Sequence, residues 1–224
     1  MHLELPKMPL QSMKDFAKHY LMIVLSILTA LGLEAWIEHT HHRHAATEAS
    51  ARIDAEIRQN LADIRKMREH DAMRLRELEH LKAVLSEDIK THASDEVVHR
   101  HAHEAVPDGL YLDYRWPVLR REAWDLAVAN QSAGWIDDER LRSYSSIYAA
   151  QATSASILAE DIPMVLNGPR MVDAMLDFDT DGYSPRELLH VVNQMAGAAH
   201  EVVGMLDNLT QRIEANLPAS RHSA

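Results

Sequence analysis

Residues 20–37 read YLMIVLSILTALGLEAWI and contain one ionisable side chain, that of Glu34. A helix of this length rises about 27 Å, which is close to the thickness of the hydrocarbon core of a bilayer. Tyr20 and Trp36 stand near the two ends of the stretch, where aromatic side chains favour the headgroup layers. The stretch predicts a transmembrane helix over 20–37, with residues 1–19 as a short cytoplasmic leader.

Two other interpretations explain part of this pattern. Ala30-Leu31-Gly32 has the small residues of a cleavage site, as in a signal peptide that is removed. The apolar run continues beyond that point to Ile37, which disfavours cleavage. The second interpretation is a buried helix of a soluble protein, which needs a core that covers every face of the helix. The rest of the chain has amphipathic stripes instead, so we prefer the membrane anchor.

The orientation of the span follows from the basic residues on its two sides. Lys7, Lys14 and Lys18 precede it, whereas only Arg43 and Arg52 follow within a comparable distance. Because positive residues stay in the cytoplasm, we expect a bacterial inner-membrane protein with its C-terminal domain in the periplasm. The chain has no cysteine, which agrees with an oxidising compartment and excludes thiol catalysis, disulfides and cysteine-ligated metals.

The acidic composition limits the partners. The net charge is −11, and the acidic excess lies after the span. Nucleic-acid binding requires a basic face that displaces phosphate counterions, and no basic stripe with interleaved aromatic residues occurs here. We therefore expect the lipid bilayer and a protein partner or a second copy of the chain as partners, and no nucleic acid.

Residues 38–106 contain neither proline nor glycine, so nothing in them stops a helix. Their charged residues predict a solvated face that includes Arg65, Glu69, Arg74, Arg76, Glu77 and Glu79. Their apolar residues recur at a helical period, at Ala46, Ala49, Ile53, Ile57, Leu61, Ile64, Met67, Leu75, Leu78, Leu81, Leu85 and Ile89. The segment predicts an amphipathic helical stalk that packs on the chain's own distal helices or on a second copy. The irregular spacing of the apolar residues favours packing on the chain's own distal helices.

A compact helical bundle is expected over 107–217, with a disordered tail over 218–224. The bundle begins after the turn signal Pro107-Asp108-Gly109, where aromatic residues become frequent. Leu110 to Arg115 is long enough for one short strand at most. Pro117 and Gly134 suit the first residue of a helix and the left-handed residue after its end.

Two further helices follow in the predicted bundle. Asp137 suits the N-cap of the first. Pro163 and then Asn167-Gly168-Pro169 are expected to break this helix before a short segment around Met171 to Leu176. Ser184, Pro185 and Glu187 make a capping box with a proline start for the second. Both have stripes with steps of three and four: Leu141, Tyr144, Tyr148, Gln151, Ala155, Leu158 and Ile162, then Leu188, Val192, Met195, Ala199, Val202, Leu206, Leu209 and Ile213. The fold class is therefore all-α, with antiparallel packing at crossing angles of about +20°.

Asp177, Asp179, Asp181 and Gly182 begin like a calcium-binding loop, with oxygen ligands at positions one, three and five and glycine at six. Position twelve, where a glutamate closes the coordination shell, is Leu188. A polar turn before a capped helix explains the same residues. A weak divalent-metal site remains the alternative.

Histidine is frequent, and His99 and His103 share a helical face with Glu96. Pairs of Glu-x-x-His helices hold two metals in ferritin-like bundles. Such sites also need two further carboxylates in an apolar core, whereas these histidines have polar neighbours. Solvated histidines are the preferred interpretation, and a metal site is the alternative.

Local catalytic signatures are absent from the sequence. The strings HEAVP and HEVVG, from His103 and His200, lack the second histidine of a zincin helix. There is no G-x-S-x-G elbow, phosphate loop or S-x-x-K motif. We therefore expect a protein that is not an enzyme and has no resident cofactor beyond the weak metal site.

Ile23 to Trp36 (IVLSILTALGLEAW), followed by a charged helix, resembles an uncharacterised group of small bacterial single-pass membrane proteins. In that group a segment like V-x-x-G-I-L-I-A-L-x-x-x-x-W precedes a helical ectodomain. Arg121 to Tyr148 is similar to the group's second pattern, an aromatic-bearing helix, a small-residue turn at Gly134 and a helix that ends in Tyr. Ser26 stands where the group usually has glycine. The resemblance implies an anchored helical protein of unknown role and no active site.

These observations predict a membrane-anchored, non-enzymatic helical interaction or scaffold protein of the cell envelope. It would act through protein–protein contacts or self-association. The alternative is a metal-binding or metal-dependent protein that uses Glu96, His99 and His103, or the turn at Asp177 to Asp181.

Overall fold

The computed structural model describes residues 13–111, 113–166 and 169–217, and in this part of the chain it contains helices and no strand. The predicted all-α fold is confirmed. The start of the predicted leader and the predicted tail lie outside the described residues. The elements are α1 (Met13–Thr91), α2 (Asp95–Ala105), α3 (Glu122–Ala129), the 3₁₀ helix η1 (Ser132–Trp135), α4 (Asp138–Leu166), α5 (Pro169–Asp179) and α6 (Pro185–Asn216).

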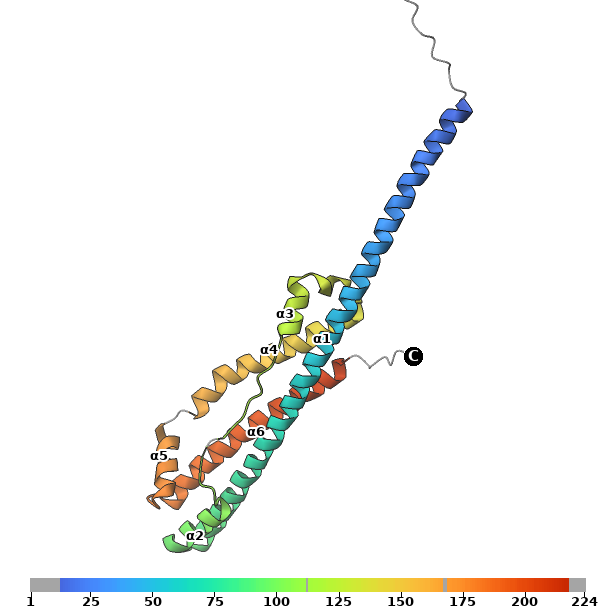
Figure 1. The fold of residues 1–224 in the computed structure, drawn as a ribbon. Helices are drawn as coiled ribbons and strands as arrows, with labels where there is room; N and C mark the ends of the chain where they lie inside the picture. The colour runs from blue at the N-terminus through green and yellow to red at the C-terminus, as the bar shows by residue number, and fades with distance from the viewer. Residues whose placement is uncertain (1–12, 112, 167–168, 218–224) are drawn as a thin grey trace, which may run out of the picture.

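Helix α1 has 79 residues, and its first part stands clear of the rest of the chain (Figure 1). Except for Val24, which is half-buried, the large apolar side chains between Phe16 and Ile37 are 45% to 68% exposed. This part is long and apolar enough to cross a membrane, and none of its most apolar stretch is buried. The interpretation as a core helix of a soluble protein therefore does not agree with the structure, because such a helix would be covered.

The second part of α1 forms the core together with α4 and α6. Helix α6 runs beside it in the opposite direction, and α4 packs on α6 (Figure 1). All eight stripe positions of α6 are buried, from Leu188 to Ile213. On α1 the buried stripe residues are Ile53, Ile57, Leu61, Ile64, Leu78, Leu81 and Leu85. The stripe thus packs on the chain's own helices, as its irregular steps indicated.

The expectation that nothing stops the helix between 38 and 106 is wrong. Helix α1 ends at Thr91, where His92 has a left-handed φ of 56°. The Ala93 N–H donates to the Asp88 carbonyl at 3.0 Å and the His92 N–H to the Ile89 carbonyl at 3.4 Å, which is a Schellman C-cap with histidine in the usual glycine position. Helix α2 then folds back, and its Val98, Ala102 and Ala105 join the cluster of Leu78, Leu81 and Leu85.

The segment between α2 and α3 is extended, which corrects two expectations. Its described residues between Leu110 and Arg115 pair with no strand, and the helix expected from Pro117 begins at Glu122. The backbone of this segment forms hydrogen bonds with side chains of α1 instead, as described below. Several of its backbone donors and acceptors are therefore paired without forming a helix or a sheet.

The ends of the later helices agree only in part with the sequence. The left-handed residue after α3 is Gln131, with a φ of 63°, whereas Gly134 lies within η1. Asp137 caps α4 as predicted, because its Oδ1 accepts the Arg140 N–H at 3.0 Å. Helix α4 continues through Pro163, so the expected break at that proline is wrong. It ends at Leu166, directly before the second predicted break at Asn167-Gly168-Pro169, and α5 contains the short segment expected around Met171 to Leu176.

Helix α6 begins at Pro185, as predicted. The expected capping box is not formed, since the Ser184 side chain makes no capping hydrogen bond. The Ser184 carbonyl accepts the Leu188 N–H at 3.0 Å, and this backbone bond closes the first turn. The proline therefore sets the start of the helix without help from a side-chain cap.

Candidate functional site

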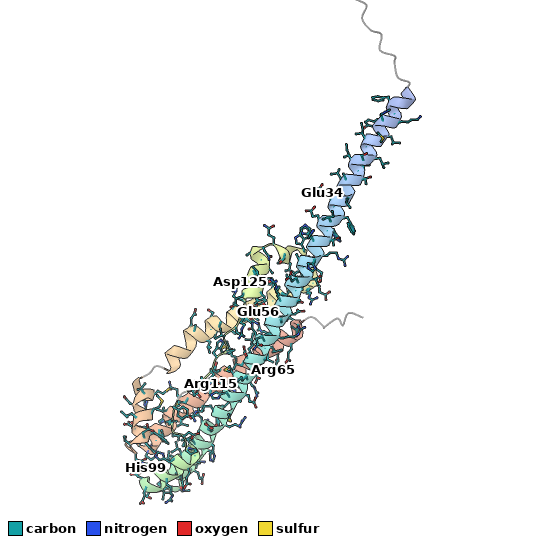
Figure 2. All side chains as sticks on the ribbon, viewed as in Figure 1. Glu34, Glu56, Arg65, His99, Arg115 and Asp125 are labelled. Atoms are coloured by element: carbon teal, nitrogen blue, oxygen red, sulfur yellow. The ribbon has the colours of Figure 1, made fainter. Side chains whose placement is uncertain are left out.

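Two of the predicted site histidines meet one of the predicted aspartates at the end of the bundle farthest from the exposed part of α1. His99 and His103 come from α2, and Asp181 comes from the turn between α5 and α6. His103 Nε2 lies 2.9 Å from Asp181 Oδ1, and His99 Nδ1 lies 3.8 Å from the same oxygen. Figure 2 labels His99 at this end of the molecule.

The cluster of His99, His103 and Asp181 has an aromatic wall. The His99 ring lies 4.7 Å from the Tyr183 ring and the His103 ring 4.5 Å from the Phe178 ring, measured between centroids. The Tyr183 hydroxyl and His99 Nε2 are buried without a hydrogen-bond partner in the described structure. Burial, and then the nearby charge of Asp181, raises the pKa of Tyr183 to about 12, so this phenol stays protonated at neutral pH.

The other predicted ligands do not join this cluster. Glu96 is exposed at the start of α2, and Asp179 is exposed in the last turn of α5. The Gly182 N–H donates to the Asp177 carbonyl at 2.8 Å, and Asp181 is left-handed with a φ of 56°. Residues 177–182 therefore form a Schellman C-cap at the end of α5. This geometry agrees with the interpretation of Asp177 to Gly182 as a polar turn before α6.

As placed, the cluster is a hydrogen-bonded histidine–aspartate pair with a second histidine nearby. Among the described residues, no group of three or more His, Asp or Glu side chains is arranged to hold a metal ion. A second pair of this kind lies on another face of α2, where His101 Nδ1 is 3.0 Å from Asp88 Oδ1. Both pairs join α2 to other elements of the bundle.

A row of polar side chains on α1, which was not predicted, binds the backbone of the extended segment and of the start of α3. Asn60 Nδ2 donates to the Arg120 carbonyl at 2.7 Å, and Asn60 Oδ1 accepts the Arg120 N–H at 2.9 Å. Asp71 Oδ1 accepts the Arg115 N–H at 3.0 Å, and Glu56 Oε2 accepts the N–H of Ala123, in the first turn of α3, at 2.9 Å. Glu56 and Arg115 are labelled in Figure 2.

Arg74 belongs to the same row and corrects the prediction of a solvated charge. Its side chain is only 5% exposed. Its Nη2 donates to the carbonyls of Gly109 and Tyr111, its Nη1 donates to Glu77, and its guanidinium lies 4.3 Å from the centre of the Tyr111 ring. Arg74 therefore holds the start of the extended segment against α1.

Nearer the exposed part of α1, a buried network joins α1 to α4. The Tyr144 hydroxyl donates to Asp54 Oδ1 at 2.6 Å and accepts the Arg140 Nε–H, also at 2.6 Å. Arg140 Nη2 donates to the other Asp54 oxygen. Burial, and then the hydrogen bond to the Asp54 carboxylate, raises the pKa of Tyr144 to about 12. The phenol therefore remains a hydrogen-bond donor at neutral pH.

One signal in the sequence marks this polar row. The apolar stripe of α1 passes from Met67 to Leu75, and the position one turn after Met67 is Asp71. A polar residue that interrupts an apolar stripe is expected to find a partner when it is buried. The identity of that partner, a backbone segment more than forty residues away, has no local signature.

Comparisons of the chain with models of known protein families, with curated proteins and with solved structures give no match. The resemblance to the group of single-pass membrane proteins stays a prediction.

Proposed function

We propose that this chain is a membrane-anchored, non-enzymatic scaffold or interaction protein of the bacterial envelope. Its N-terminus would lie in the cytoplasm and its helical bundle in the periplasm. The main support is the continuity of α1, because the exposed apolar part and the buried part, from Ser50 onward, belong to one helix. A span that continues into a core helix without a linker holds the bundle at a fixed height above the bilayer.

The buried and half-buried polar groups of this part of the bundle support a structural rather than a catalytic role. Asn60, Asp71, Arg74 and Glu56 bind the backbone of the chain itself, and Asp54 binds Tyr144 and Arg140. Each of these contacts fixes one element against α1. Each of these side chains uses at least one polar atom to hold the fold, and Asp71 Oδ2 and Arg74 Nε are buried without a hydrogen-bond partner in the described structure.

Helix α5 offers a surface for a protein partner at the far end of the bundle. Val172 and Leu176, one turn apart on α5, are 56% and 65% exposed. Met171 and Phe178 of the same helix are buried in the core. Exposed apolar residues on one helical face favour contact with another protein or a second copy.

Photo-crosslinking tests this proposal. A photoreactive residue at Leu176 of the full chain, in membranes of the native cells, is expected to give an adduct. The same residue at Gln211, an exposed position of α6, should give none. The mass of the adduct separates a second copy from a foreign partner. Absence of an adduct at 176, or equal adducts at both positions, would contradict the proposal.

A second candidate, a metal-binding protein, rests on the convergence of His99, His103 and Asp181. Two imidazoles and a carboxylate are ligands that zinc and related ions accept. A metal would have to draw His99 Nδ1 and Asp181 Oδ1 closer than the 3.8 Å that separates them. A metal titration decides between the two candidates.

A further inference from the structure

Trp135 presents a large exposed aromatic ring close to the point where α1 leaves the bundle. Its side chain lies at the end of η1 and is 54% exposed. One face of the indole stacks on the His42 ring of α1, with centroids 3.7 Å apart and planes 10° apart. The stacking fixes the height of Trp135 along α1 at the level of residue 42.

That height corresponds to the outer headgroup layer of a membrane crossed by residues 20–37. His42 follows Ile37 by five residues, which is a rise of about 7.5 Å along the helix. Each headgroup layer of a bilayer is about 5 to 8 Å thick outside the hydrocarbon core. Trp36 lies about 9 Å before His42 along the same helix. The fold thus places two exposed tryptophans, 36 and 135, at the inner and outer limits of one interface.

The rest of this corner supports contact with lipid. Figure 1 shows α3 and the turn that follows it at the end of the bundle nearest the free part of α1. Val128, Ala129 and Gly134 are exposed there, and none is charged. Asp137, Asp138 and Glu139 follow at once, so anionic lipid adds no attraction. The matching occupant is a zwitterionic headgroup layer that accepts an aromatic ring.

We propose that the corner at residues 128–135 rests on the surface of the bilayer that α1 crosses, with Trp135 as a second interfacial anchor. This inference rests on the anchoring stated in the proposed function. Two contacts, the span and the corner, would prevent the bundle from tilting about α1. They would hold α2 and α5 at the far side, directed away from the membrane.

The absence of cysteine permits a clean labelling experiment. Gly32, Gly134 and Gly197 are each open to a side chain, because a Cβ at any of them meets nothing within 4 Å. Gly32→Cys, Gly134→Cys and Gly197→Cys place a nitroxide in the span, at the corner and on the exposed side of α6. The full chain is reconstituted in phosphatidylcholine vesicles, and the access of oxygen and of a water-soluble nickel chelate to each label is measured.

We expect the label at 32 to be open to oxygen and closed to nickel, the label at 197 to show the reverse, and the label at 134 to be intermediate. When Trp135→Ser is added to the Gly134→Cys variant, the oxygen and nickel accessibilities of the label at 134 should become equal to those of the label at 197. A label at 32 in lipid together with equal accessibilities at 134 and 197 would overturn the corner contact alone. Nickel access at 32 would overturn the anchoring itself. Spin–spin broadening at 134 would assign the corner to a second copy and overturn the lipid contact.

Discussion

The side chain of Asn60 pairs with the backbone of Arg120 through two hydrogen bonds, one donated and one accepted, at 2.7 Å and 2.9 Å. Asn60 is fully buried, and its Nδ2 also lies 3.3 Å from Gln151 Oε1 on α4. The side-chain amide of Asn60 thus binds both the N–H and the carbonyl of Arg120, as the backbone of a neighbouring strand would do in a sheet. It joins α1, α4 and the segment between α2 and α3 at one point.

Replacing Asn60 with leucine should therefore lower the free energy of unfolding substantially. Leucine fills a similar volume but removes two hydrogen bonds to the half-covered backbone of Arg120 and one to the buried Gln151. Each hydrogen bond contributes about 0.5 to 1.5 kcal/mol, and a partner left buried and unpaired adds about 1 to 3 kcal/mol. We expect a loss of about 2 to 5 kcal/mol in urea unfolding of the full chain in detergent.

Gln59→Leu is the matched control for this variant. Gln59 is the preceding residue, and its side chain is exposed and bonded only to Asp63 on the same helix in the described structure. Its loss should cost less than about 0.5 kcal/mol. Equal losses for the two variants would show that the Asn60 contacts add no stability.

Asp71 predicts a dependence of stability on pH. Burial raises the pKa of this carboxyl above its ordinary value of 3.8, although the Arg115 N–H acts in the opposite direction. The unfolded chain ionises Asp71 first as the pH rises, so this residue destabilises the fold progressively from pH 3.8 until the pH exceeds its folded pKa. Asp71→Asn keeps the acceptor for Arg115 and removes this loss.

We expect Asp71→Asn to raise the melting temperature at neutral pH, with a gain that shrinks as the pH is lowered and vanishes below 3.8. Thermal unfolding of both proteins across this range measures the difference. A gain that is constant with pH would assign the effect to packing rather than to ionisation.

The sequence allowed the helices to be predicted more securely than their ends and connections. The stripe of α6 is buried at every predicted position, because apolar residues that recur at the helical period lie on the one face of the helix that packs in the core. The stop at His92 was missed because a histidine occupies a left-handed position that usually favours glycine. The extended segment was missed because the residues that hold it are on α1. The meeting of His99, His103 and Asp181 depends on the same reversal at His92, so only the individual ligands could be named from the sequence.

The core formed by α1, α4 and α6 should not tolerate a charge at Leu206. This side chain is fully buried in the cluster with Ile57, Tyr144 and Ile147. Leu206→Asp buries a carboxylate without a partner, at a cost of several kcal/mol, against a total stability of about 5 to 15 kcal/mol. We expect the variant to lose cooperative unfolding, as followed by circular dichroism.

Asn193→Asp, at an exposed position of the same helix, should leave the melt nearly unchanged. If Leu206→Asp instead melts normally and alters the oligomeric state in light scattering, the stripe of α6 faces a second chain. The intramolecular core would then be wrong.

The proposed topology predicts the location of the C-terminus. A reporter that is active only outside the cytoplasm, fused after Ala224, should be active, because Lys7, Lys14 and Lys18 favour a cytoplasmic leader. Exchanging these three lysines for glutamate should lower the reporter signal. Activity of a reporter that works only in the cytoplasm would reverse the topology.

A zinc titration distinguishes the scaffold from the metal-binding protein. A ligand that binds only the folded chain stabilises it by about 2.7 kcal/mol at one hundred times its dissociation constant, which a thermal shift detects readily. The scaffold proposal expects no shift, because the His103–Asp181 pair already forms a hydrogen bond at 2.9 Å and His99 stands apart from it.

Two variants locate any metal that does bind. Asp181→Asn keeps an oxygen acceptor for His103 and removes the charge that a metal requires, whereas Asp179→Asn changes an exposed carboxylate outside the cluster. A shift in the unmodified chain that Asp181→Asn abolishes and Asp179→Asn preserves would establish the metal site in place of the scaffold role. A shift preserved in both variants would place the metal elsewhere, for example among His39, His41 and His44, which follow the span.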